Sequence, residues 1–222
     1  MKNVRNVFLV VGLLFAATMV MAAGKTKEKV EVLENKGTSR SLKDPAWLTA
    51  YISSGISAVE ALDLYKGKYC FIIEHDDLNK DFAIAWVGGA EAPRAVAAKI
   101  ATTVSSSMSN ASGGGGSTGS AGEMSYGVKS AAEAIANASF NGLTKDADWW
   151  ETRRNKKTKE VTTTATALFL IDKKQLDTQV AAQLQRLADQ NTAMSAAEKA
   201  IYADMIAQVR GVGGFGSLSR DD

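Results

Sequence analysis

The sequence predicts an α+β protein, with a small, mostly antiparallel sheet of about three main strands packed against several helices on one face. Two runs, Tyr69–Ile73 and Val161–Ile171, have the β-branched and aromatic residues that are typical of strands. Elsewhere apolar residues recur every three or four positions, which is the spacing of amphipathic helices. The resulting order of helix, strand, helix, helix, hairpin, helix, helix favours an antiparallel sheet covered by helices.

The first 23 residues have the pattern of a cleavable signal peptide. Lys2 and Arg5 give a positive start, residues 7–21 are apolar or small, and Ala22 and Ala23 supply a small-residue exit. This apolar run has 15 residues, whereas a membrane-spanning helix needs about 20. We therefore expect cleavage near Ala22 or Ala23, export to a bacterial periplasm, and no transmembrane segment after cleavage. The alternative is an uncleaved membrane anchor.

The cysteine and charge content limit the partners. Cys70 is the only cysteine and lies far from the predicted cleavage site, so we expect no lipid anchor and no internal disulfide. Its place in an apolar run indicates a core residue. Without Lys2 and Arg5 the chain carries 24 basic and 24 acidic residues. Nothing in this balance favours nucleic acid, which requires a basic surface.

Residues 24–43 read as a flexible lead-in that can hold a short strand at Val30–Leu33. A single domain is predicted over 44–210. It begins with a helix that has Asp44 as its N-cap and Pro45 in its first turn. Steps of three or four over Asn79–Met108 predict one long helix, kinked at Pro93.

The middle of the domain is rich in Gly and Ser at 109–122, which predicts a flexible loop between two helices. A hairpin follows, from Asp148–Arg153 to Val161–Ile171, with a polar turn at Asn155–Lys159. Two helices come next, the first capped by Asp172 and the second by an S-x-x-E box beginning at Ser195. Residues 211–222 are predicted to be a flexible tail.

Three stretches resemble a known group of proteins. They are DPAWL at 44–48, YCFIIEHDDLNKDFAIAW at 69–86, and DADWWETRRNKKTKEVTTTATALFLIDKKQL at 146–176. The chain resembles small exported envelope proteins of spirochaetes. More distantly it is similar to the 20-kDa outer-membrane lipoprotein family and to the N-terminal domain of the flagellar T protein. The resemblance implies an α+β envelope domain without known catalysis, of the kind that forms scaffolds around envelope assemblies. Many such relatives carry a lipid on a cysteine that this chain lacks.

The chain offers little for chemistry. His75 is the only histidine, and its acidic neighbours alternate between the two faces of a strand, which disfavours a metal site. The run GGGGSTGSAG at 113–122 lacks the lysine of a phosphate-binding loop. With one histidine, a serine-hydrolase triad has no support. We therefore expect no catalytic residue, no metal and no cofactor.

Four residues are the candidates for binding a partner: Trp149, Trp150, Arg153 and Arg154. Adjacent tryptophans on one strand point to opposite faces, so one enters the core. The other is either covered by a further segment or exposed as an anchor for a partner. The arginines begin a basic run that continues through Lys156, Lys157 and Lys159. That run is either a solvated turn or a docking surface for anionic groups of the envelope.

These observations predict a non-catalytic interaction or scaffold protein of the cell envelope, associated with the motility apparatus or with envelope assembly. The alternative is a periplasmic protein that binds a small ligand, which requires a closed apolar pocket of a few hundred Å³. A hydrolase is a third reading. It requires a cleft with a strongly perturbed carboxylate or lysine.

Overall fold

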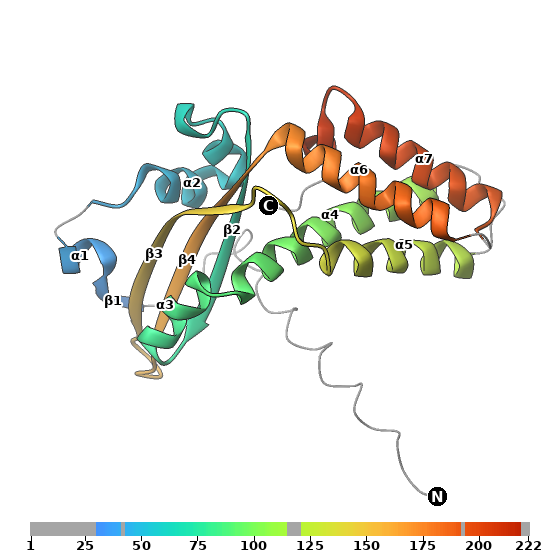
Figure 1. The fold of residues 1–222 in the computed structure, drawn as a ribbon. Coiled ribbons are helices and arrows are strands. Elements are labelled where there is room, and N and C mark those ends of the chain that lie inside the picture. The colour runs from blue at the N-terminus through green and yellow to red at the C-terminus, as the bar shows by residue number, and fades with distance from the viewer. Residues whose placement is uncertain (1–29, 41–42, 115–120, 192–193, 219–222) are drawn as a thin grey trace, which may run out of the picture.

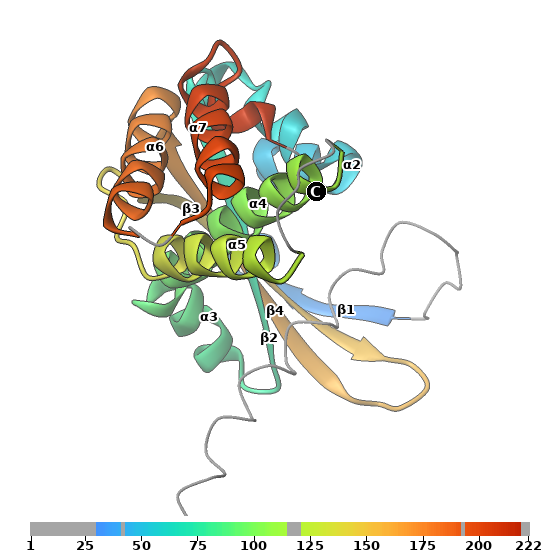
Figure 2. The ribbon, with the colours of Figure 1, turned by 90° about the vertical axis from the view of Figure 1, so that its right-hand side faces the viewer.

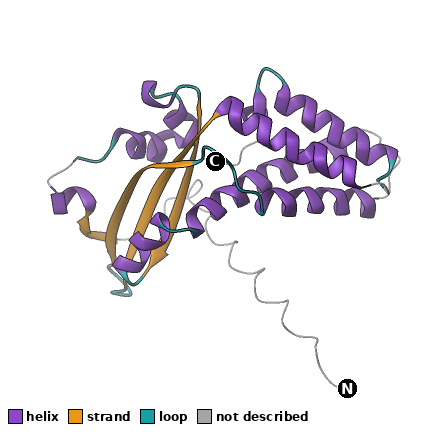
Figure 3. Ribbon diagram, viewed as in Figure 1, coloured by secondary structure: helices purple, strands orange, loops and turns teal. Residues whose placement is uncertain are grey.

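The computed structural model describes residues 30–40, 43–114, 121–191 and 194–218 (Figure 1). The predicted signal peptide and residues 115–120 of the predicted loop lie outside them. The described residues form an α+β fold, as the sequence predicts (Figure 3). In chain order the elements are β1 (Val30–Asn35), α1 (Lys36–Arg40), α2 (Ala46–Glu60), η1 (Asp63–Tyr65), β2 (Lys68–Asp77), α3 (Lys80–Gly88), α4 (Glu91–Gly114), α5 (Ala121–Ala136), β3 (Thr144–Asn155), β4 (Val161–Asp172), α6 (Lys173–Gln190), α7 (Ala196–Arg210) and η2 (Gly214–Ser217).

The sheet has four strands rather than three, in the order β1-β3-β4-β2, and each is antiparallel to its neighbours. The additional strand, β1, comes from the segment that the sequence predicts as a flexible lead-in. A strand at Val30–Leu33 is confirmed, although it extends to Asn35 and is followed by α1. Flexibility is therefore wrong for residues 30–40, because β3 supplies β1 with a hydrogen-bonded neighbour, with Val32 opposite Arg153.

Alternate residues of the strands enter two separate cores. The face that carries Phe71 and Trp150, which we call the α3 face, packs against α3 and the start of α4. The opposite face carries Cys70, Ile72 and Trp149; we call it the α2 face, since α2 packs on it. The prediction that helices cover only one face of the sheet is therefore wrong. The core position of Cys70 is confirmed.

The predicted long helix Asn79–Met108 is two helices. α3 ends at Gly88, where the N–H of Gly89 donates to the carbonyl of Trp86 at 3.1 Å, and two residues separate it from α4, which begins at Glu91. Pro93 does not kink α4. It lies in the first turn, where a backbone N–H has no acceptor within the helix, so its missing donor costs nothing.

Helices α4 to α7 run side by side and extend away from the sheet (Figures 1 and 2). α4 pairs with α5, and α6 pairs with α7. The flexible loop predicted at 109–122 is wrong for 109–114 and 121–122, which are helical. α4 has apolar residues at helical spacing that are buried through Met108, and this packing carries the helix into the glycine-rich segment.

The capping signals are confirmed with one exception. Asp172 accepts a hydrogen bond from the N–H of Gln175, and Ser195 and Glu198 form a complete capping box. A further cap is found at α3, where Asn79 accepts from the N–H of Phe82. Asp44 does not cap α2, because Pro45 itself occupies the N-cap position and makes no side-chain hydrogen bond.

The end of the chain is held against the domain through residue 218, so the predicted flexible tail is wrong for 211–218; residues 219–222 lie outside the described part. Phe215 and Leu218 are buried. The N–H of Phe215 donates to Asp177 at 2.6 Å, and the N–H of Gly216 donates to the hydroxyl of Tyr69 at 2.8 Å. These contacts fix η2 beside α6 and β2.

Candidate functional site

The two predicted tryptophans both lie in the protein core. Trp149, at 6 % exposed, packs with Trp47 and Leu48 of α2, while Trp150, at 9 % exposed, packs on the α3 face. The ammonium of Lys80 covers the ring of Trp150, 3.9 Å from its centroid. Their opposite orientation is confirmed, but an exposed tryptophan anchor is wrong, because each ring has its own cover.

The two predicted arginines are engaged within the sheet. Arg153 donates to Glu151 at 2.6 Å, and Arg154 lies 3.9 Å from Glu31 of the neighbouring strand β1. The hydrogen bond to Glu151 raises the pKa of Arg153. Partial burial of the guanidinium lowers that pKa, but the negative charge of Asp76 also raises it, so the net shift is upward. The structure therefore does not bring the four candidates together into one site. The two tryptophans lie in different cores, and each arginine is partly neutralised by its own carboxylate.

Beyond the arginines, Asn155 organises the hairpin loop. Its side-chain oxygen accepts from the N–H of Lys157 at 2.9 Å and of Thr158 at 3.2 Å. Its backbone N–H and carbonyl pair with Glu160 and Lys159 at 2.9 and 2.8 Å. An Asn at such a position is the usual signal of a side-chain-supported turn. The basic loop is therefore a preformed structure.

Strand β1 forms one edge of the sheet, since it pairs with β3 alone among the described strands. Its large apolar side chains remain exposed: Val30 at 42 %, Val32 at 51 % and Leu33 at 40 %. Val30 and Val32 share one face, and Leu33 is the extra residue of a bulge. Sequence reasoning missed this edge as a candidate site, although the alternation of valine and glutamate is its signal.

Ion pairs hold β1 and α1 against the rest of the protein. Lys80 of α3 lies 2.9 Å from each carboxylate oxygen of Glu34. Lys36 of α1 donates to the carboxylate and to the backbone carbonyl of Asp148 on β3. Desolvation raises the pKa of Asp148, but hydrogen bonds from Lys36 and Lys145 outweigh it and hold that pKa below its usual value. The edge strand thus has a fixed position.

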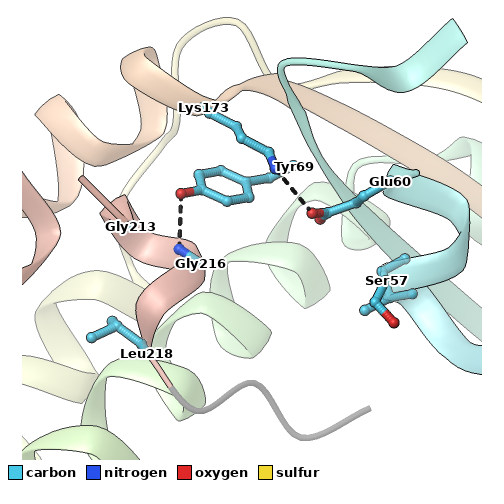
Figure 4. Close-up of a pocket in the computed structure, with 8 residues that line it drawn as sticks. Ser57, Glu60, Tyr69, Lys173, Gly213, Gly216 and Leu218 are labelled. Atoms are coloured by element: carbon cyan, nitrogen blue, oxygen red, sulfur yellow. Dashed lines mark hydrogen bonds and ion pairs between the residues drawn. The ribbon is translucent and has the colours of Figure 1, made fainter. Parts of the chain in front are cut away.

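A pocket of about 370 Å³ lies between α2, β2, the start of α6 and η2 (Figure 4). Lys173 and Glu60 form an ion pair across it at 3.3 Å, and Glu60 also accepts from the N–H of Cys70 at 2.9 Å. Tyr69 donates to Asp177 at 3.0 Å. The other residues that line the pocket are a mixture of apolar side chains, a serine and glycine backbone: Ile56, Ser57, Gly213, Gly216 and Leu218. The pocket thus combines one ion pair with apolar side chains.

The single histidine lies in an aromatic cluster. Its ring stacks on Trp86 with centroids 4.5 Å apart and packs edge-on against Phe82. Asp77 is 3.8 Å from its Nε2 atom. Among the described residues, no group of three or more His, Cys, Asp or Glu side chains is arranged to hold a metal ion.

No protein-family model, characterised protein or solved structure matches the chain. The resemblance to exported envelope proteins thus stays a prediction. In the described part of the chain, no helix combines the length and apolar character needed to cross a bilayer.

Proposed function

We propose that this protein is a non-catalytic interaction protein of the bacterial cell envelope, exported to the periplasm, and that it binds a partner protein along the edge strand β1. The observation that carries the proposal is an edge strand with three exposed apolar side chains. An unpaired edge can add an extended segment of another chain as a further strand. The signal-peptide pattern of residues 1–23 supports the envelope location.

The features of β1 suit strand addition. Main-chain groups on its outer side supply hydrogen bonds, and Val30 and Val32 supply an apolar row for alternate side chains of the partner. The ion pairs from Lys80 and Arg154 hold the strand in place before binding. A preformed strand lowers the entropic cost of association.

The partner strand is more favourably a different sequence than a second β1. In an antiparallel pairing centred on β1, Glu31 would lie opposite Glu34 of the other copy. Like charges directly opposite each other destabilise a strand pair. We therefore expect a partner segment with apolar residues at alternate positions and no acidic residue facing these glutamates.

A non-catalytic role accords with how the chain uses its polar groups. The ring of His75 on β2 packs against Trp86 of α3, and the buried Glu198 caps α7. Asp177 holds the chain end by accepting from Tyr69 and Phe215. These groups have structural tasks in the described residues.

The test places a photo-crosslinking amino acid at Val32 in the native envelope, with the matched control at Ile52, which is 74 % exposed on α2. We expect Val32 to crosslink one partner within an extended segment identified by mass spectrometry, and Ile52 not to do so. A synthetic peptide of that segment should then slow amide hydrogen exchange in β1. Equal crosslinking from both positions, or a bound peptide that leaves β1 exchange unchanged, contradicts the proposal.

A second candidate, binding of a small ligand, is favoured by the pocket beside Lys173. A ligand there would contact Tyr69 and disturb the ion pair with Glu60. A small molecule that raises the melting temperature of the wild type but not of Lys173→Met would support it. If no compound of a broad metabolite panel shifts the melting temperature, this candidate fails.

A further inference from the structure

We propose that the tip of the β3–β4 hairpin docks the protein on an anionic phospholipid surface through Lys156, Lys157 and Lys159. This contact is separate from strand addition at β1. All three lysines are exposed. Within the described part of the chain none of them forms an ion pair, whereas Arg153 and Arg154 are paired. The charge available to a partner therefore belongs to the loop lysines.

The loop presents these charges in a fixed arrangement. Asn155 accepts from the N–H groups of Lys157 and Thr158, and its backbone closes the turn with Lys159 and Glu160. Fixed positions reduce the entropy lost when a loop meets its partner.

Lys159 occupies a position that ordinarily favours another residue. Its φ is +65°, the left-handed region that glycine and asparagine adopt most easily. A lysine there retains a charge at some cost in conformational energy. Strain kept at an exposed loop points to a task for the side chain.

The position of the loop at the tip of the hairpin favours a partner with an extended surface. The β3–β4 ribbon projects beyond the helices, with the loop at its tip (Figure 2). Three exposed ammonium groups at the tip of a projecting ribbon can each meet a different phosphate of a flat surface. Glu160 is the one acidic residue in the loop, which leaves 156–160 with a net charge of +2. Such a charge attracts an anionic bilayer within roughly 10 Å.

The test is sedimentation with vesicles. It uses the protein as purified from the cells that produce it. The vesicles are pure phosphatidylcholine, or phosphatidylcholine with one third phosphatidylglycerol. Neutralising all three loop lysines to Gln should weaken binding to the anionic vesicles about a hundredfold, since each lysine near such a surface contributes roughly a factor of five. High salt should also weaken binding of the wild-type protein to the anionic vesicles.

The matched control changes Lys129, Lys174 and Lys199 to Gln, which removes the same charge from exposed helical positions. We expect that variant to bind as the wild type does. An equal loss in both variants, or equal wild-type binding to neutral vesicles, overturns the proposal. Displacement by inorganic phosphate beyond that by chloride of equal ionic strength overturns it in favour of a small-anion site. Tighter binding to duplex DNA than to anionic vesicles also overturns it. Crosslinking at Val32 is a separate readout, so this result and the test of strand addition can fail independently.

Discussion

The ammonium group of Lys80 lies 3.9 Å from the centroid of the Trp150 ring while also contacting both carboxylate oxygens of Glu34 at 2.9 Å. One side chain thus joins three elements, α3, β3 and the edge strand β1. It covers one face of the Trp150 ring. It also fixes the strand on which the proposed partner site depends.

Replacing Lys80 by Met keeps most of the side-chain volume and removes the charge. We expect the free energy of unfolding to fall by about 1–2 kcal/mol, through loss of the cation–π contact and of the ion pair. Urea denaturation measures this. Combining it with Glu34→Gln should give a coupling energy of about 0.5 kcal/mol or more. Lys129→Met, at an exposed helical pair, should cost less than about 0.5 kcal/mol. Equal costs at both lysines would show that the Lys80 cluster adds nothing.

Trp149 carries the core between the sheet and α2. Trp149→Ala should lower the free energy of unfolding by about 3–5 kcal/mol, because it leaves a cavity beside Trp47 and Leu48. Ile52→Ala on the exposed side of α2 should cost less than about 0.5 kcal/mol. A cost below about 1 kcal/mol for Trp149→Ala would show that α2 packs loosely. A loss of partner binding in the Trp149 variant therefore reports damage to the core rather than an interface.

The hairpin and its faces could be predicted because the local pattern carries the needed information. Alternation along β4 places Ala165 and Phe169 in one core and Leu168 in the other. Asn155 marks the turn. Helix caps at Asp172 and Ser195 are equally local, since a side chain meets an N–H three residues later.

The wrong predictions concern features of the structure that depend on contacts between distant residues or on where in a helix a residue lies. Pro93 reads as a kink only if the helix starts before Gly88; once α4 begins at Glu91, the same proline is harmless. β1 is ordered by its pairing with β3, more than 100 residues away. The cover over Trp150 comes from Lys80, and sequence alone does not place that ammonium over the ring. For the same reason the exposed edge, and not the tryptophans, became the candidate site.

The chain end offers a sharp test of order in the described tail. Gly214 has φ of +56°, and a Cβ at this position would collide with the carboxylate of Asp177. Gly214→Ala should therefore lower the free energy of unfolding by about 2 kcal/mol or more, through strain and loss of the contacts to Phe215. Amide exchange at Phe215 should also accelerate. Gly67 has positive φ with open space around a Cβ, so Gly67→Ala should cost only the strain, about 1 kcal/mol. Equal costs for both would contradict the packed tail.

Substitution of Lys159 should change the loop charge and the stability of the protein in different directions. Lys159→Gly relieves the left-handed backbone and should raise the free energy of unfolding by up to about 1 kcal/mol, while removing one of three loop charges. Lys157→Gly lacks that relief and should not stabilise. Chemical denaturation of the two variants checks the difference. A destabilised Lys159→Gly would mean that the lysine side chain supports the loop in another way.

Asp148 gives the protein a defined acid response. Its pKa in the folded state lies below that of an unfolded Asp, about 3.9, because Lys36 and Lys145 outweigh the desolvation of its carboxylate. A lowered pKa adds stability that is complete above the unfolded value and is lost as the pH falls through the folded value. Asp148→Asn should therefore cost about 1 kcal/mol near neutral pH, and the difference from wild type should shrink as the pH falls below the unfolded value of about 3.9. Urea denaturation across this pH range measures it.

Asp63→Asn is the matched control, because the Asp63–Lys66 pair is almost fully exposed and should contribute little at any pH. A difference for Asp148→Asn that stays constant with pH would mean that the amide loses a contact unrelated to charge. A difference that grows as the pH falls would reverse the sign of the linkage, and would show that the ammonium groups of Lys36 and Lys145 do not stabilise the ionised carboxylate that joins α1 to β3.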